Sequence, residues 1–244
     1  MIDLHCHILP GVDDGARDLD DSLAMARQAA GDGIGLVCAT PHIRHDHDVV
    51  IGELAERVAA LNHELSAQGI PVEVARGGEV AEAALDGLTP GELMAVSLGG
   101  AGRWVLLEPA PGRLSDGLLA RVESLRRRGV GAVIAHPERH WGEDLPERLE
   151  ALVARGALMQ ITAAALENTA SGPALIKLAE RGLVHLVASD SHSSHFGRPM
   201  TVSGALRRLE GASRVGSHLD WISRQAPEAI VRGLDVEPPF GTAA

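Results

Sequence analysis

Histidines and acids crowd the first residues of the chain. His5 and His7 follow a short apolar segment at residues 2–4, and Asp13 and Asp14 come soon after them. Because side chains alternate along a strand, two imidazoles two residues apart point to the same side. Two nitrogen ligands would then converge on one metal ion. A single His-x-His pair is as common at a polar surface terminus, so the rest of the chain has to decide.

Further imidazoles and carboxylates each come just after a short apolar segment. With the first pair they are His5, His7, His42, Glu79, Glu108, His136, Asp190 and His192. Imidazole and carboxylate ligands without thiolates suit Mn, Fe or Zn, and several carboxylates allow bridging between ions. A multinuclear centre of this kind polarises a substrate oxygen and lowers the pKa of bound water. The implied reaction class is metal-assisted hydrolysis.

The apolar segments that must position these side chains alternate with helical patterns. Strands are expected at residues 2–4, 35–39, 72–75, 104–107, 130–135, 158–161 and 184–188, and helices at 18–30, 54–65, 117–128, 146–155 and 174–181. Seven strands alternating with helices predict an α/β protein with a parallel sheet, closed into a barrel one unit short of the (β/α)8 design. Such barrels place their chemistry at the carboxyl ends of the strands.

The composition suits one domain with an aliphatic core. The chain has 244 residues, 45% of them hydrophobic and only 2% aromatic, with no Tyr. Leu, Val, Ile and Ala must therefore build the core, which suits parallel strands buried between helices. We expect a single domain over residues 1–244, with a frayed tail from about residue 236.

Charge and cysteine content exclude several classes of protein. The net charge of -11 argues against a general nucleic-acid binder, because affinity for the phosphate backbone needs clustered cations. Only Cys6 and Cys38 are present, which predicts free thiols in a reducing compartment. The sequence contains no run near the roughly 18 apolar residues of a membrane span. We therefore expect a cytoplasmic protein without membrane insertion.

The ordered motifs resemble the PHP (polymerase and histidinol phosphatase) superfamily. They are HCHILPGVDDGA at residues 5–16, ATPH at 39–42, GGEV at 77–80, LLEP at 106–109, IAHPERH at 134–140 and ASDSH at 188–192. The branch that they most resemble is the bacterial PHP-type protein-tyrosine phosphatases of capsule and exopolysaccharide systems. The resemblance extends from residue 2 to about residue 230. It implies a distorted (β/α)7 barrel of the PHP type.

The resemblance also implies a set of site residues. It predicts three divalent ions, with Mn expected and Fe or Zn as alternatives: one held by His5, His7, Glu79 and Asp190, a second by Glu79, Glu108 and His136, and a third by Asp14, His42 and His192. Asp13 could replace its neighbour Asp14, although a role in bracing the loop or an imidazole suits it better. Arg139 and Arg198 resemble the residues that bind the substrate phosphate, to which a planar guanidinium can donate two hydrogen bonds.

The implied activity is hydrolysis of phosphotyrosine by attack of a metal-bound hydroxide. The expected partner is a phosphotyrosine-bearing protein, in particular a bacterial tyrosine kinase of exopolysaccharide or capsule regulation. One alternative is a histidinol-phosphate or other small-molecule phosphatase, and another is a non-catalytic scaffold that binds a phosphoprotein. Family members often carry aromatic residues after the two glutamates, where this chain has Val80-Ala81 and Pro109-Ala110. We therefore expect weak discrimination among tyrosine peptides.

A rival pattern and several further residues need separate interpretation. Cys38 and Arg44 satisfy the Cys-x5-Arg pattern of thiol-based phosphatases, but the loop between them has no Gly and contains Pro41, which has no N–H to offer a phosphate. Asp3 is expected to be a hydrogen-bonding residue. Solvated or structural roles are expected for His45, His47, His63, His185, His218 and the Arg126-Arg127-Arg128 run, whereas His140 and His195 stay undecided.

Overall fold

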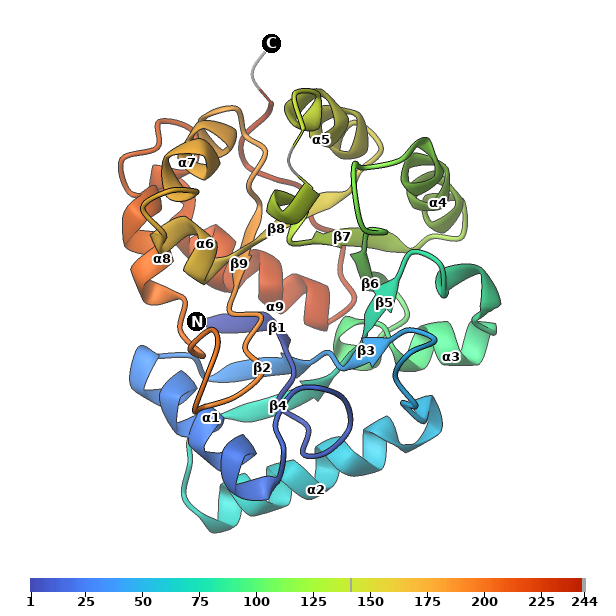
Figure 1. Ribbon diagram of the computed structural model, residues 1–244, viewed down its shortest axis with the longest axis vertical. Helices are drawn as coiled ribbons and strands as arrows, with labels where there is room; N and C mark the ends of the chain where they lie inside the picture. The colour runs from blue at the N-terminus through green and yellow to red at the C-terminus, as the bar shows by residue number, and fades with distance from the viewer. Residues whose placement is uncertain (141, 243–244) are drawn as a thin grey trace.

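Parallel strands form the interior of the molecule (Figure 1). The computed structural model describes residues 1–140 and 142–242. Within these residues one sheet has the order β1-β2-β4 and a second has the order β3-β5-β6-β7-β8-β9. The strands are β1 (Ile2–Cys6), β2 (Leu36–Ala39), β3 (His42–Ile43), β4 (Glu73–Arg76), β5 (Glu79–Ala81), β6 (Trp104–Glu108), β7 (Gly131–Ala135), β8 (Leu158–Thr162) and β9 (Leu186–Ala188).

The two sheets are parts of one barrel, which is divided into two hydrogen-bonded sheets because two of its strands are interrupted. The chain runs from β2 into β3 through Pro41, which lacks the N–H needed to continue a ladder. It runs from β4 into β5 through Gly78, where an added Cβ would lie 2.8 Å from a side-chain atom of Ile43. A parallel bridge between Cys6 and Ser191 joins the two sheets on the other side. Counting each interrupted strand once leaves seven positions around the barrel, as the sequence predicted.

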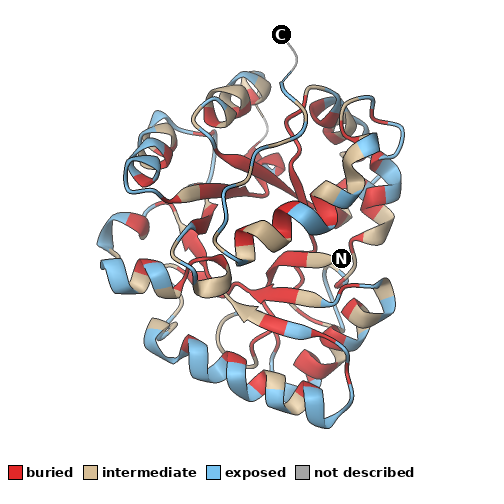
Figure 2. Cartoon of the chain, turned by 180° about the vertical axis from the view of Figure 1, so that it is seen from behind, coloured by how far each residue is buried: buried red, intermediate tan, exposed pale blue. Residues whose placement is uncertain are grey.

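Helices surround this barrel and turn their apolar sides toward it (Figure 2). Within the described residues they are α1 (Leu19–Asp32), α2 (Leu54–Ala67), α3 (Pro90–Ala95), α4 (Asp116–Arg127), α5 (Leu145–Val153), α6 (Ala163–Glu167), α7 (Gly172–Glu180), α8 (Ser203–Leu209) and α9 (Ala226–Val231). The five predicted helices correspond to α1, α2, α4, α5 and α7. Helix α1 begins after Asp18, whose carboxylate accepts the N–H of Asp21, and ends at Gly33 with a left-handed φ of 85°.

The core is divided by the alternation of side chains along the strands. In β6, Leu106 packs in a smaller cluster with Leu4 and Val133, whereas Val105 and Leu107 belong to the larger cluster that includes the helices. A side chain that points into a barrel and its neighbour that points outward necessarily contact different elements. The short apolar segments therefore supply both layers of the core at once.

In the C-terminal tail, one side chain contacts the body of the molecule. Phe240 lies with its ring centroid 5.8 Å from that of His185 and 5.5 Å from that of Trp221, and it packs against the larger core cluster. This aromatic contact is made with residues distant in the sequence, so the local composition of the tail could not reveal it. No helix within residues 1–140 and 142–242 combines the length and apolar character that crossing a membrane requires.

Candidate metal centre

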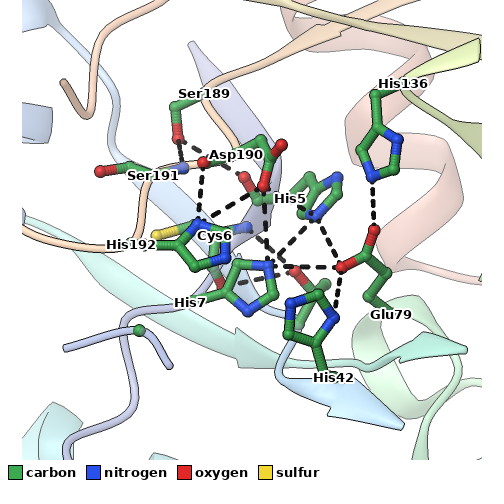
Figure 3. A network of polar contacts seen from close by, with 12 residues as sticks. His5, Cys6, His7, His42, Glu79, His136, Ser189, Asp190, Ser191 and His192 are labelled. Atoms are coloured by element: carbon green, nitrogen blue, oxygen red, sulfur yellow. Dashed lines mark hydrogen bonds and ion pairs between the residues drawn. The ribbon is translucent and has the colours of Figure 1, made fainter. Parts of the chain in front are cut away.

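Imidazoles and carboxylates from most strands meet at the carboxyl end of the barrel (Figure 3). The Nε2 atoms of His5 and His7 lie 3.3 Å apart, so the two side chains converge as their spacing predicted. His192 stacks on His7 with a centroid distance of 3.9 Å. The ends of β1 and β9 are neighbours in the barrel, which explains how segments 185 residues apart in the chain share one site.

Glu79 lies at the centre of the cluster and is fully buried. Its Oε2 atom is 3.4 Å from His5 Nε2, 3.5 Å from His7 Nε2 and 2.9 Å from His42 Nδ1. Its Oε1 atom lies 2.7 Å from His136 Nε2. One carboxylate thus faces four imidazoles, which is the position that a bridging ligand between metal ions requires.

All nine residues expected to bind metal lie in this cluster. Among the described residues, their ligand atoms form four overlapping groups, each with every atom within 4.8 Å of the others: His7, Asp14, His42 and His192; His5, His136 and Asp190; His5, His7 and Glu79; and His42, Glu79 and Glu108. The overlap of the groups through His5, His7, His42 and Glu79 makes the site one continuous centre. Several ions could share ligands across it.

The neighbouring acids Asp13 and Asp14 have different surroundings. Asp14 Oδ1 lies 3.4 Å from His42 Nε2 and 3.6 Å from His192 Nε2. Asp13 Oδ2 instead lies 2.7 Å from His7 Nδ1, on the side of that ring turned away from the cluster, and it also accepts the N–H of His42 at 2.9 Å. The geometry therefore gives Asp14 the position of a ligand and Asp13 that of a brace for the imidazole.

Two side chains hold His5 in place. The sequence alone did not identify Gln160, and it indicated for Asp3 only the role of a hydrogen-bonding residue. Gln160 Oε1 lies 2.9 Å from His5 Nδ1, and because an amide oxygen only accepts, that nitrogen carries the proton and leaves Nε2 free. The sequence feature that could have revealed Gln160 is its position as a polar residue within the apolar strand β8. Asp3 Oδ1 accepts the N–H groups of His5 and Ser189, as expected of a hydrogen-bonding residue. Burial raises the pKa of Asp3 to about 6.

Two of the expected ligands have an unusual backbone. His136 has a φ of 31° and Asp190 a φ of 50°, the two left-handed residues other than glycine among those described. Such a conformation costs on the order of 1–3 kcal/mol and persists only where the surrounding structure enforces it. Here the N–H of Asp190 donates to the carbonyl of His5, and the N–H of Arg139 donates to that of His136. The strain falls on residues that turn from a strand end into the site.

The charges of the cluster favour a bound cation. Burial disfavours the charged form of His7, but its hydrogen bond to Asp13 and the nearby carboxylate of Glu79 outweigh burial and raise its pKa to about 10. Burial also opposes ionisation of Glu79, yet the surrounding imidazoles, with His5 foremost, hold the pKa of its carboxyl well below the usual range. Glu79 Oε2 and His42 Nδ1 are buried and lie 2.9 Å apart without the geometry of a hydrogen bond, and His136 Nδ1 is buried without a hydrogen-bond partner. Buried oxygen and nitrogen atoms whose lone pairs are not used in hydrogen bonds fit divalent metal ions.

A cavity of about 400 Å³ opens onto the centre. The described residues that line it are Asp14, His42, Arg44, Glu108, Arg139, His192, Phe196, Gly197 and Arg198. Both arginines expected to bind phosphate are therefore at the site. Arg139 makes an ion pair with Asp190, and Arg198 Nη2 lies 3.1 Å from the same carboxylate. Their charge is thus concentrated beside the cluster, where a phosphoryl group would need it.

Arg44 is a third arginine of the cavity, which sequence reasoning considered only as part of the thiol pattern. It makes two 2.8 Å bonds to Asp46 and lies 3.5 Å from Glu108 Oε2. Cys38, the other residue of that pattern, is fully buried in β2, and burial raises the pKa of its thiol to about 12. A thiol so rarely ionised is not a nucleophile. The structure thus separates the two residues of the rival motif.

Three other histidines and the run of arginines at the end of α4 lie outside the groups of described residues that could hold a metal ion. The ring of His47 lies 4.8 Å from that of His42, so it borders the site although no motif indicated it. His140 Nδ1 bonds the carbonyl of Gly112, which is a structural role. His195 is exposed and lies outside the metal groups. The Arg126-Arg127-Arg128 run is exposed at the end of α4, as predicted.

A parallel α/β barrel that gathers imidazoles and carboxylates at its strand ends, with arginines facing the same cavity, defines the class of metal-dependent phosphohydrolases. Comparison with known families narrows this class. The chain belongs to the CpsB/CapC family, described as "Capsular polysaccharide synthesis, CpsB/CapC", whose model matches residues 1–232. This family assignment agrees with the branch that the sequence motifs resembled.

Individual relatives extend over most of the chain. Tyrosine-protein phosphatase YwqE of Bacillus subtilis is 34% identical, covering 98% of this chain and 95% of its own. Putative tyrosine-protein phosphatase CapC of Staphylococcus aureus is 26% identical, covering 79% and 77%. A chain from the crystal structures of YwqE and of Streptococcus pneumoniae CpsB, described as unique metal-dependent tyrosine phosphatases, matches with a TM-score of 0.81 at 31% identity and full coverage of both.

Proposed function

We propose that the chain is a metal-dependent protein-tyrosine phosphatase. The observation that carries the proposal is the buried carboxylate of Glu79, which faces four imidazoles at the edge of a cavity that also holds Arg139 and Arg198. The names of its relatives in Bacillus subtilis and Staphylococcus aureus support phosphotyrosine as the substrate. The complete set of expected site residues argues against a scaffold that binds phosphoproteins without hydrolysing them.

We further propose that three divalent ions, most simply Mn, occupy the centre. The proposed ligands are His5, His7, Asp14, His42, Glu79, Glu108, His136, Asp190 and His192. When bound, such ions supply a water of lowered pKa and polarise the phosphoryl oxygens. The chain's own contribution is to fix two of the imidazoles with Nε2 turned to the centre: Asp13 does this for His7, and Gln160 does it for His5.

The arginines receive the phosphate in this proposal. Arg139 and Arg198 share Asp190 as a partner, so each can turn one edge of its guanidinium toward an incoming phosphoryl group. Planar guanidinium groups donate pairs of charge-assisted hydrogen bonds to phosphate oxygens. These bonds strengthen as charge develops during phosphoryl transfer, which lowers the barrier. The two arginines would therefore contribute to both binding and catalysis.

The physiological partner in this proposal is a phosphotyrosine-bearing protein, in particular a tyrosine kinase of a capsule or exopolysaccharide system. The description of the family as one of capsular polysaccharide synthesis supports this context. A cytoplasmic location stays a prediction from the sequence. The histidinol phosphate phosphatase of Lactococcus lactis has a TM-score of 0.53 at 11% identity, a likeness of fold that does not favour its substrate for this chain.

A substrate panel on metal-free and reconstituted protein tests the proposed function. After removal of metal with EDTA, we expect hydrolysis of phosphotyrosine peptides to disappear and to return when Mn is added. Glu79→Gln should abolish the activity, whereas Cys38→Ser should retain it. Loss of activity in Cys38→Ser with intact metal content would instead favour a cysteine nucleophile.

The other outcomes of the panel separate the alternatives. Histidinol phosphate as a substrate better by about 100-fold in kcat/KM, roughly 2.7 kcal/mol of transition-state preference, would refute the tyrosine-phosphatase assignment. A metal-loaded protein that hydrolyses no phosphomonoester would support a binding role. Phosphoserine peptides provide the comparison for selectivity within proteins.

A further inference from the structure

One apolar side chain stands among the charged groups of the metal cavity. Phe196 is 59% exposed and lines the cavity together with Arg139 and Arg198. Apart from Gly197, the other described lining residues are acids, histidines and arginines. A phosphate alone needs only such polar groups. An exposed phenyl ring at the same cavity is useful only to a ligand that also has an apolar part.

The loop that carries Phe196 is anchored on both sides. Before it, Asp21 of α1 accepts the backbone N–H of Ser194 at 2.8 Å. After it, the carbonyl of Arg198 accepts the Ser191 hydroxyl at 2.8 Å. Gly197 has a left-handed φ of 79°, which turns the chain between Phe196 and Arg198 so that both line one cavity. The phenyl ring and the guanidinium are therefore held together by the same short turn.

The other aromatic side chains in the described part of the chain pack away from this cavity. Trp104 is 6% exposed within the smaller core cluster, and Trp221 packs against Phe240 of the tail. Val80, which follows the central glutamate, is fully buried and has no ring to offer. Among the described residues that line the cavity, Phe196 is the one with a phenyl or indole ring.

We propose that Phe196 determines specificity by packing its ring against the aryl ring of the phosphotyrosine substrate while the arginines hold the phosphate. This inference rests on the proposed function and names the residue that receives the leaving group. Aromatic rings attract one another in offset or edge-to-face arrangements in addition to burying apolar area. Alkyl phosphates such as phosphoserine offer no such surface. Phe196 should therefore favour aryl over alkyl substrates without changing affinity for phosphate itself.

The test compares Phe196→Ala and Phe196→Trp with the wild-type protein. Binding of phenylphosphonate and of methylphosphonate to Mn-loaded protein is measured by calorimetry, together with kcat/KM for a phosphotyrosine peptide. We expect Phe196→Ala to weaken phenylphosphonate binding and to lower kcat/KM by about 10-fold, with methylphosphonate binding within about 2-fold of wild type. Phe196→Trp should retain the wild-type values within about 2-fold. The control variant Met94→Ala removes a side chain of similar exposure, 53%, that lies outside the cavity, and it should bind both phosphonates as the wild type does.

Two results would overturn the inference. Equal weakening of both phosphonates in Phe196→Ala would mean that the substitution disturbs Arg198 and not an aryl contact. Unchanged binding of phenylphosphonate would mean that the ring is not used. If the wild-type protein prefers phenylphosphonate in a Phe196-dependent way but hydrolyses no phosphotyrosine peptide, the proposed function fails while the aryl-binding role of Phe196 stands.

Discussion

Replacing Asp13 by Asn should weaken metal affinity without replacing any proposed ligand. The carboxylate of Asp13 receives three N–H groups: Oδ1 accepts from Gly15, and Oδ2 accepts from His42 and from Nδ1 of His7. An asparagine side chain has a single oxygen, so it cannot accept from both sides. If its oxygen keeps the bond to Gly15, its amide donates toward His7 Nδ1. The imidazole must then carry its proton on Nε2, the nitrogen that faces the metal centre.

The size of the effect follows from this change of tautomer. Loss of a hydrogen-bond partner behind a ligating imidazole typically costs 10- to 100-fold in metal affinity, or about 1.4–2.7 kcal/mol. We expect a loss within this range for Asp13→Asn in either orientation of the asparagine amide. With its oxygen toward His7, the neutral amide is a weaker acceptor than the carboxylate; with its oxygen toward Gly15, it stabilises the tautomer that cannot bind through Nε2, and the backbone N–H of His42 also loses its partner.

Titration of metal-free protein with Mn, followed by calorimetry and by recovery of phosphatase activity, measures the change. Asp20→Asn is the matched control, because this carboxylate is exposed in the first turn of α1 and belongs to none of the metal groups. Circular dichroism should show that both variants are folded. Equal Mn affinity for Asp13→Asn and the wild type would refute the argument that Asp13 sets the tautomer of His7.

Two other predictions follow. Arg139→Ala should lower kcat/KM for a phosphotyrosine peptide by about 10-fold or more, since a charge-assisted contact contributes about 1.5–3 kcal/mol; wild-type kinetics in this variant would remove Arg139 from the site. Burial lowers the pKa of His185 to about 4. As the pH falls, His185 is therefore protonated in the unfolded chain before it is protonated in the folded protein. The free energy of unfolding should decrease by up to about 3 kcal/mol as the pH falls from about 6.5 to 4. Denaturant unfolding at several pH values should show a shallower pH dependence for His185→Asn than for wild type. The exposed control His63→Asn should retain the wild-type dependence, and equal slopes for all three would contradict the prediction.

Local sequence patterns were sufficient for the plan of the barrel and for the residue types of the site. Each predicted strand is a short apolar segment whose alternating side chains fill the two layers of the core, as in β6. A helix such as α1 is defined by near neighbours, from its cap at Asp18 to the glycine at its end. Both signals depend on residues a few positions apart, so they can be read without the fold.

Contacts between distant segments decided what the pattern could not. Asp13 and Asp14 are adjacent and chemically alike, and only their approach to His7 and to His192 gives them different positions. The place of Phe196 depends on a hydrogen bond between Asp21 and Ser194, which are 173 residues apart. Side chains on loops and at strand ends are oriented by the segments that pack against them. Residues adjacent in the sequence give no information about these long-range contacts. The relative positions of the side chains in the site were therefore decided by the tertiary structure.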